Sequence, residues 1–181
     1  MSNVYGVNFV NCLLTYSGLM SDTNTNLQYN SGNPFVYVNT SGVVSASKTS
    51  VLFDGCQFRT QPNYAVKYFV VNYTTFIGCV FERCTGLSNG NMLKDYGEII
   101  GCEFVLTSSS RALLLDGNNI IVDNARIYAV AEDTSRQVVY LSGSLTKGYV
   151  RVLYSGNDRS NLAGGTISVP VEFIGLRTYG T

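Results

Sequence analysis

Apolar and polar positions along the chain are organised around one short motif that recurs. In this motif two large apolar residues flank a Gly-Cys pair, and it occupies residues 53–58, 76–81 and 99–104. The cysteines Cys56, Cys79 and Cys102 are therefore evenly spaced along the chain. A fixed spacing of this size, about 23 residues, is typical of a solenoid, in which each repeat forms one coil that stacks on its neighbours.

Weaker copies extend the repeat in both directions. Residues 122–127 have Asn124 and Ala125 in the places of Gly and Cys, residues 145–150 and 171–173 keep part of the pattern, and residues 9–14 include Cys12. The interval from Cys12 to Cys56 is almost twice as long as the others, which leaves room for two coils. The last apolar position of the motif then recurs at Leu14, Phe35, Phe58, Phe81, Phe104, Ile127, Val150 and Phe173. We therefore expect about seven or eight coils of about 23 residues.

Two kinds of solenoid have a repeat near this length. A leucine-rich repeat needs leucines at fixed offsets and a ladder of asparagines, and the chain has neither. The remaining fold is all-β, a right-handed parallel β-helix with roughly three short strands in each coil. Further strands are expected at the apolar runs 36–38, 51–53, 66–71, 113–115, 120–122 and 138–141, and no segment has the apolar stripe of a helix.

The Gly-Cys pair has a structural interpretation. Gly and Asn tolerate a positive φ, so the chain can turn sharply there in every coil. The residue that follows then points inward, and Cys12, Cys56, Cys79 and Cys102 are expected to stack as small, inert core side chains. A zinc or iron–sulfur site does not fit, because ligand pairs of such sites are usually two to four residues apart. Cys84 lies outside this series.

Composition narrows the function classes. Lys plus Arg and Asp plus Glu both number 12, so no excess positive charge favours nucleic acid or an acidic membrane as a partner. There is no His, which removes every mechanism that needs an imidazole, and neither a metal site nor a cofactor is expected. No apolar stretch is long enough for membrane insertion, and residues 1–6 do not resemble a signal peptide.

The 181 residues are expected to form a single β-helix domain, 1–181, without a capping helix at either end. Two explanations fit the missing caps: the domain is a segment of a longer spike, or partner chains cover its ends.

The chain resembles the tailspike and tail-fibre proteins of bacteriophages in its motif at 53–58, 76–81 and 99–104, its polar loops and its lack of His. This resemblance implies a homotrimer on the phage tail of the virion, made in the host cytoplasm, that binds a bacterial surface polysaccharide and in some cases cleaves it. Pectate-lyase-like enzymes share the coil pattern, and no catalytic motif of either group can be matched residue by residue.

Candidate binding residues follow from the strand that comes after each Cys. Alternate residues of this strand should point outward, so that side chains of successive coils form columns on one face. This face is expected to combine cations and tyrosines for sugar binding with two carboxylates: Arg59, Arg126, Tyr128, Tyr149, Arg151, Glu82 and Glu103.

Glu82 and Glu103 are also the candidate catalytic pair. One coil and two residues apart, their Cα atoms should be separated by ~8 Å. The carboxyl groups of inverting glycosidases are held at a similar separation. Three hypotheses remain open: host attachment through glycan binding, a polysaccharide hydrolase or lyase, and a structural shaft whose alternating charges are only solvated. Whether the chain is an enzyme is not decided by its sequence.

Overall fold

The computed structural model describes residues 6–16, 36–38, 51–60, 69–82, 91–106, 112–129, 137–142, 147–156 and 162–177. Within these ranges every regular element is a β-strand, and every strand pairing is parallel. The strands form two sheets, one of 11 strands and one of six, which we call sheet A and sheet B. No helix in these ranges has the length and apolar character needed to cross a membrane.

Sheet A has two panels that meet at the Gly-Cys corner. The first panel holds β1 (Val7–Val10), β4 (Val51–Asp54), β7 (Thr74–Ile77) and β10 (Glu98–Ile100). The second panel holds β2 (Leu13–Tyr16), β5 (Gln57–Thr60), β8 (Val80–Glu82) and β11 (Glu103–Leu106). Three longer strands run through both panels: β13 (Ile120–Ala129), β15 (Gly148–Gly156) and β17 (Val171–Arg177).

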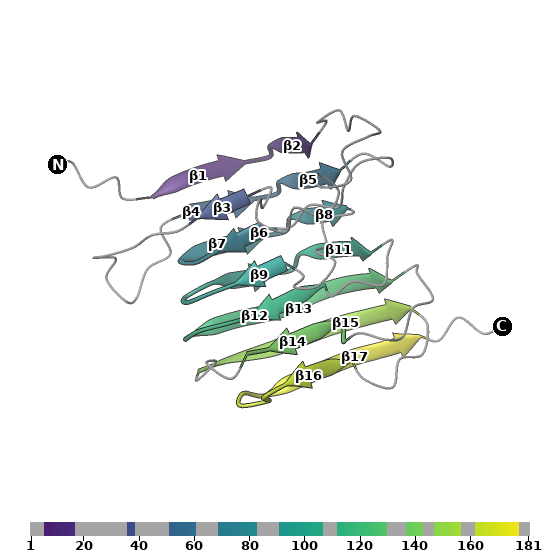
Figure 1. Ribbon diagram of the computed structural model, residues 1–181. Coiled ribbons are helices and arrows are strands. Elements are labelled where there is room, and N and C mark those ends of the chain that lie inside the picture. The colour runs from purple at the N-terminus through teal and green to yellow at the C-terminus, as the bar shows by residue number, and fades with distance from the viewer. Residues whose placement is uncertain are drawn as a thin grey trace, which may run out of the picture.

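Sheet B faces sheet A across the core. Its strands are β3 (Val36–Val38), β6 (Phe69–Val71), β9 (Asn91–Leu93), β12 (Leu113–Leu115), β14 (Val139–Leu141) and β16 (Ala163–Gly165). In Figure 1 sheet B is nearer the viewer and runs to the left, sheet A runs to the right, and the chain descends from layer to layer. This winding is right-handed, and the predicted right-handed parallel β-helix is confirmed.

The predicted repeat length holds in the middle of the stack. Phe53 is paired with Phe76, and the next two steps of that register lead to Ile99 and Val122. The three coils that lead from β4 to β7, from β7 to β10 and from β10 to β13 therefore have one length. The coils on either side have other lengths, so the expectation of about seven or eight coils of equal size was wrong in detail.

The step from Cys12 to Cys56 is one layer and not two. β1 pairs directly with β4 and β2 with β5, so no layer of sheet A separates Leu14 from Phe58. Phe35, the residue assigned to the missing coil, lies outside the described residues. β3, a strand of sheet B, lies between β2 and β4 in the chain, so this coil has one strand in sheet B and its additional residues add no layer.

Two further core positions were assigned to the wrong column. Val150 is paired with Val122 and not with Ile127, whose partner is Tyr154. Phe173 is paired with Val152, which occupies the column of the cysteines. The reason is that Ala125 and Val152 are paired although the coil between them is four residues longer than the central coils. A slip of four residues along β15 keeps every inward side chain inward, so the apolar pattern alone did not reveal it.

The corner between the panels has the backbone conformation that the sequence predicts. Its residues have φ angles of 51° at Asn11, 61° at Gly55, 57° at Gly78, 60° at Gly101 and 52° at Asn124. Gly and Asn are the residues that adopt this left-handed conformation most readily. One such residue in each of these five layers turns the chain from the first panel into the second, whereas β15 passes the corner without a positive φ.

The side chains behind the corner stack along the axis of the solenoid. Phe81 lies between Phe58 and Phe104, with ring centroids 4.7 Å apart on both sides. A second column joins Phe9, Phe53 and Phe76 at 4.8 and 5.0 Å. These spacings match the distance between hydrogen-bonded strands, so each ring contacts its equivalent in the next layer.

The cysteine column is confirmed as part of this core. Cys56, Cys79 and Cys102 are buried, and Cys12 in the first layer is partly exposed. Each buried thiol donates a hydrogen bond to a carbonyl oxygen of the preceding layer, at Phe9, Phe53 and Phe76 respectively. Burial raises the pKa of the Cys56 thiol, and the contact with the Cys102 thiol, followed by burial, raises that of Cys79. Thiols that resist ionisation in this way are poor nucleophiles.

Candidate functional site

The outward face of the second panel carries most of the predicted binding residues. In β8 and β11 the side chains alternate between partly exposed and buried, so every second residue points away from the core. One outward column contains Gln57, Val80, Glu103 and Arg126, which the strand register places side by side. The neighbouring column contains Arg59, Glu82, Val105 and Tyr128. We call these two columns the second-panel face.

An ion pair occupies one end of this face. Arg59 of β5 is the direct neighbour of Glu82 of β8, and its Nε lies 2.6 Å from Glu82 Oε2. The two side chains are 52% and 38% exposed, so solvent weakens their attraction. Arg59 nevertheless competes with any ligand group for the carboxylate of Glu82.

Glu103, Arg126 and Tyr128 form the other end of the face. Glu103 and Arg126 are direct neighbours across β11 and β13, and Tyr128 follows two residues after Arg126 on the same side. Tyr128 is 36% exposed. A carboxylate, a guanidinium and a phenol ring are thus available to solvent within two adjacent strands. This arrangement can hydrogen-bond sugar hydroxyls and stack on a sugar ring.

The two candidate catalytic glutamates are diagonal neighbours. Glu82 is paired with Val105, and Glu103 is paired with Val80, so they lie on adjacent strands at positions two residues apart. Both are partly exposed. The repeat predicted this diagonal placement. The two glutamates belong to the second-panel face.

Tyr149 and Arg151 do not join the two columns, because Leu153 and Ser155 are the partners of Arg126 and Tyr128 in β15. Tyr149 is paired with Ile121 of the first panel, and Arg151 lies level with the corner and is paired with Glu172. Arg151 Nε lies 3.1 Å from Glu172 Oε2, and its Nη1 lies 3.7 Å from Asp123 Oδ1. The slip of four residues in the expected register explains this displacement. Two carboxylates thus engage Arg151.

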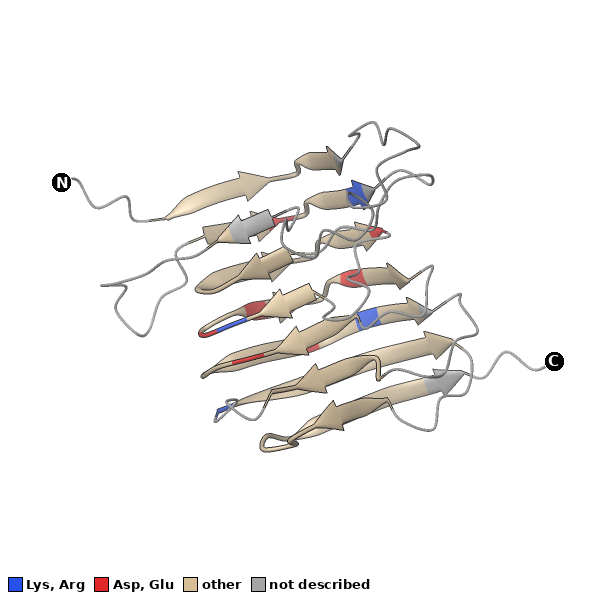
Figure 2. Ribbon diagram, in the orientation of Figure 1, with Lys and Arg blue, Asp and Glu red and all other residues tan. Residues whose placement is uncertain are grey.

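Charged side chains are unevenly distributed over the solenoid. On the described strands they all belong to sheet A, as Figure 2 shows, and none belongs to sheet B. The outward residues of sheet B are Val70, Met92, Leu114, Tyr140 and Gly164. One face of the described strands is therefore uncharged along its length.

A feature that the sequence analysis missed lies where the chain passes from sheet B into the first panel. Tyr73 and Tyr96 are equivalent residues of neighbouring layers, and their rings stack with centroids 5.0 Å apart and planes inclined by 17°. Both have positive φ angles, 48° and 54°. The signal was present in the sequence, because Tyr73, Tyr96 and Asn119 follow one another at the same interval as the cysteines.

The described residues include no cluster of three or more His, Cys, Asp or Glu that could hold a metal ion. Cys84, the cysteine outside the core column, is not among them. Comparisons with protein-family models, with curated proteins and with solved structures give no match for this chain. The geometry of its own surface is thus the basis for a functional assignment.

Proposed function

We propose that this protein is a tailspike-like β-solenoid that recognises a bacterial surface polysaccharide through the second-panel face. The observation that carries the proposal is the placement of Arg126 between Glu103 and Tyr128 on a face that continues along the solenoid axis. A polysaccharide is a linear polymer, and a column of side chains repeated at ~4.8 Å offers it contacts in several layers. In this proposal the chain is a segment of a spike on the virion.

The chemistry of the face suits hydroxyl-rich ligands. Carboxylates accept hydrogen bonds from sugar hydroxyls, and guanidinium groups donate to hydroxyls or to acidic substituents. The Tyr128 ring supplies an apolar surface with a polar end, which suits a sugar ring. The equal number of acidic and basic residues in the chain gives no reason to prefer a polyanion such as nucleic acid.

Binding to an array of bacterial capsule and lipopolysaccharide glycans tests this proposal. We expect the unmodified protein to bind one class of glycan, and Arg126→Ala and Tyr128→Ala to weaken binding by roughly tenfold each. Arg151→Ala is the matched control, because Arg151 is an exposed arginine outside the two columns and is engaged by Glu172 and Asp123. A protein that binds no glycan would instead support a purely structural shaft.

The alternative function is cleavage of the polysaccharide. The diagonal placement of the carboxylates of Glu82 and Glu103 supports this second candidate. Incubation of the bound polysaccharide with the protein, followed by measurement of new reducing ends or unsaturated sugars, tests for a hydrolase or a lyase. In an enzyme of this kind Glu82→Gln and Glu103→Gln abolish cleavage and keep binding. If the unmodified protein releases no fragments, the enzyme hypothesis is wrong.

We also propose that the protein assembles as a homotrimer through sheet B. The uncharged column Val70, Met92, Leu114 and Tyr140 supports this, because it can meet its own copies without repulsion between like charges. Light scattering on the unmodified protein should give the mass of a trimer, and Leu114→Glu should lower it. Tyr128→Glu, on the opposite face, is the control and should leave the mass unchanged. A monomeric unmodified protein would contradict this assembly.

A further inference from the structure

One position in each of three successive layers has a positive φ at the turn from sheet B into the first panel. It is occupied by Tyr73 at 48°, Tyr96 at 54° and Asn119 at 51°. Asparagine adopts this conformation readily, whereas a bulky side chain is an outlier there. The two tyrosines therefore have a conformational cost that an asparagine or glycine would largely avoid. Such strain is often retained where a side chain has a role in binding.

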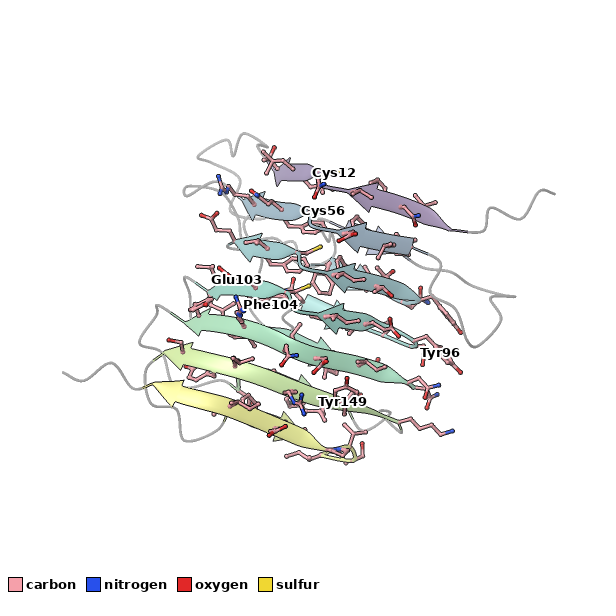
Figure 3. The ribbon with its side chains drawn as sticks, turned by 180° about the vertical axis from the view of Figure 1, so that it is seen from behind. Cys12, Cys56, Tyr96, Glu103, Phe104 and Tyr149 are labelled. Atoms are coloured by element: carbon pink, nitrogen blue, oxygen red, sulfur yellow. The ribbon has the colours of Figure 1, made fainter. Side chains whose placement is uncertain are left out.

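The tyrosine stack ends at this point of the solenoid. The rings of Tyr73 and Tyr96 are 5.0 Å apart and nearly parallel, but the third layer has the short amide of Asn119 in the equivalent place. Among the described residues, the face of the Tyr96 ring that is turned away from Tyr73 therefore has no third ring against it. Figure 3 shows Tyr96 and Glu103 on opposite sides of the solenoid. We call the stacked pair of Tyr73 and Tyr96 the tyrosine ridge. This ridge is thus a separate surface from the second-panel face.

The backbone around the ridge is held in place by neighbouring layers. The amide of Tyr73 donates to the carbonyl oxygen of Asp95, and that of Tyr96 donates to the carbonyl oxygen of Asn118, both at 2.8 Å. Asp95 Oδ1 accepts a further hydrogen bond, 2.7 Å long, from the amide of Asn118. The backbone that carries the Tyr96 ring is consequently held in place before any ligand arrives, which lowers the entropy cost of binding.

The charges near the ridge do not favour an anionic ligand. Lys94 and Asp95 precede Tyr96 directly, Glu98 follows it by two residues, and Asp116 precedes Asn119 by three residues. Lys147 follows in the fourth layer, because Gly148 is paired with Ile120. With two cations and three anions, the ridge offers no electrostatic attraction for a polyanion, and this argues against nucleic acid or a strongly acidic polymer.

We propose that a pyranose ring of an uncharged glycan occupies the third place in the stack, against Tyr96 and beside Asn119. The apolar face of the sugar contacts the tyrosine ring, and the amide of Asn119 can both donate to and accept from sugar hydroxyls. This inference rests on the proposed glycan recognition but uses residues outside the second-panel face.

The experiment uses short neutral hexose oligosaccharides, with uronic acid oligosaccharides of equal length as a matched set. The chain contains no Trp, so Tyr96→Trp introduces a single tryptophan whose emission reports on sugar binding. We expect binding of a neutral member with little dependence on salt. Tyr96→Ala should weaken it by roughly tenfold, and Tyr96→Phe should retain it.

Asn119→Tyr provides a test that does not depend on removing a ring. It places a third tyrosine at a position whose φ is close to the angles that Tyr73 and Tyr96 already adopt. The new ring should fill the site, so that binding is lost while the fold stays intact.

If Arg126→Ala and Tyr128→Ala abolish binding while Tyr96→Ala and Asn119→Tyr do not, this inference is wrong and the second-panel face remains the glycan site. If no oligosaccharide binds the unmodified protein, this inference is wrong, and the glycan array decides the proposed function separately. Preference for the uronic acid set would overturn the uncharged ligand.

Discussion

The thiol of Cys79 donates a hydrogen bond to the carbonyl oxygen of Phe53, 3.3 Å away in the preceding layer. The two residues are 26 positions apart in the chain, so this contact exists only when neighbouring layers are in register. The equivalent contacts of Cys56 and Cys102 repeat it above and below. The cysteine column is thus a side-chain counterpart of the backbone hydrogen bonds between layers.

Replacing Cys79 by alanine should destabilise the protein. The change removes a buried sulfur atom and its hydrogen bond and leaves a small cavity, which together cost about 1–3 kcal/mol. Urea denaturation followed by circular dichroism measures the difference. Gln57→Ala, an exposed position in the same corner region, should change the free energy of unfolding by less than about 0.5 kcal/mol. Equal stability of the Cys79 variant and the unmodified protein would show that the column contributes nothing.

Stability should fall at alkaline pH because of the Cys56 thiol. Burial raises the pKa of Cys56 in the folded state, which therefore holds this proton more tightly than the unfolded chain does. The contribution of Cys56 is therefore complete below the unfolded pKa of about 8.5 and decreases as the pH rises above it. The free energy of unfolding, measured under reducing conditions between pH 7 and 10, should decline less steeply in Cys56→Ala than in the unmodified protein. Parallel pH profiles of the two proteins would contradict this.

The ring column should be most sensitive at its centre. Phe81 is 1% exposed and contacts rings on both sides, so Phe81→Ala should cost about 3–5 kcal/mol. Phe9 is 37% exposed, and it stacks on Phe53 from the first layer. Phe9→Ala removes the same atoms and should cost less than half as much. Comparable losses for both variants would mean that the first layer is packed as tightly as the interior.

The central layers could be predicted from the sequence because each residue of the Gly-Cys pair has its own structural role. Gly55, Gly78 and Gly101 turn the chain, and the cysteine that follows each one fills the space behind the turn. Each copy therefore fixes its own register, and the pairings of Arg59 with Glu82 and of Glu103 with Arg126 follow. The sequence was sufficient for this part of the candidate site.

Beyond Ala125 the pattern no longer fixes the register. Val150, Val152 and Tyr154 all point inward in β15, so an apolar template fits equally well at several positions two residues apart. The choice between them depends on the length of the preceding connection, which apolar periodicity does not report. Tyr149 and Arg151 were displaced from the second-panel face for this reason.

The tyrosine ridge was missed for a different reason. Tyr73 and Tyr96 are at turn positions, where Gly and Asn are the residues usually sought, and a tyrosine with positive φ is not expected there. The only signal in the sequence is that the two tyrosines are separated by the length of one coil. Because the layers lie in register, residues at this spacing occupy equivalent places and their rings can stack.

Substitutions at Gly78 test the corner itself. Its φ is 57°, and a Cβ atom built on it would have no other atom of the described residues within 4 Å, so the cost of a side chain there comes from the backbone alone. Gly78→Ala should therefore destabilise by about 1–2 kcal/mol. Gly78→Asn should cost clearly less, because Asn11 and Asn124 occupy the same corner position with φ angles of 51° and 52°. Urea denaturation of the two variants compares them directly. If asparagine is as destabilising as alanine, the left-handed conformation is not the reason for glycine at this position.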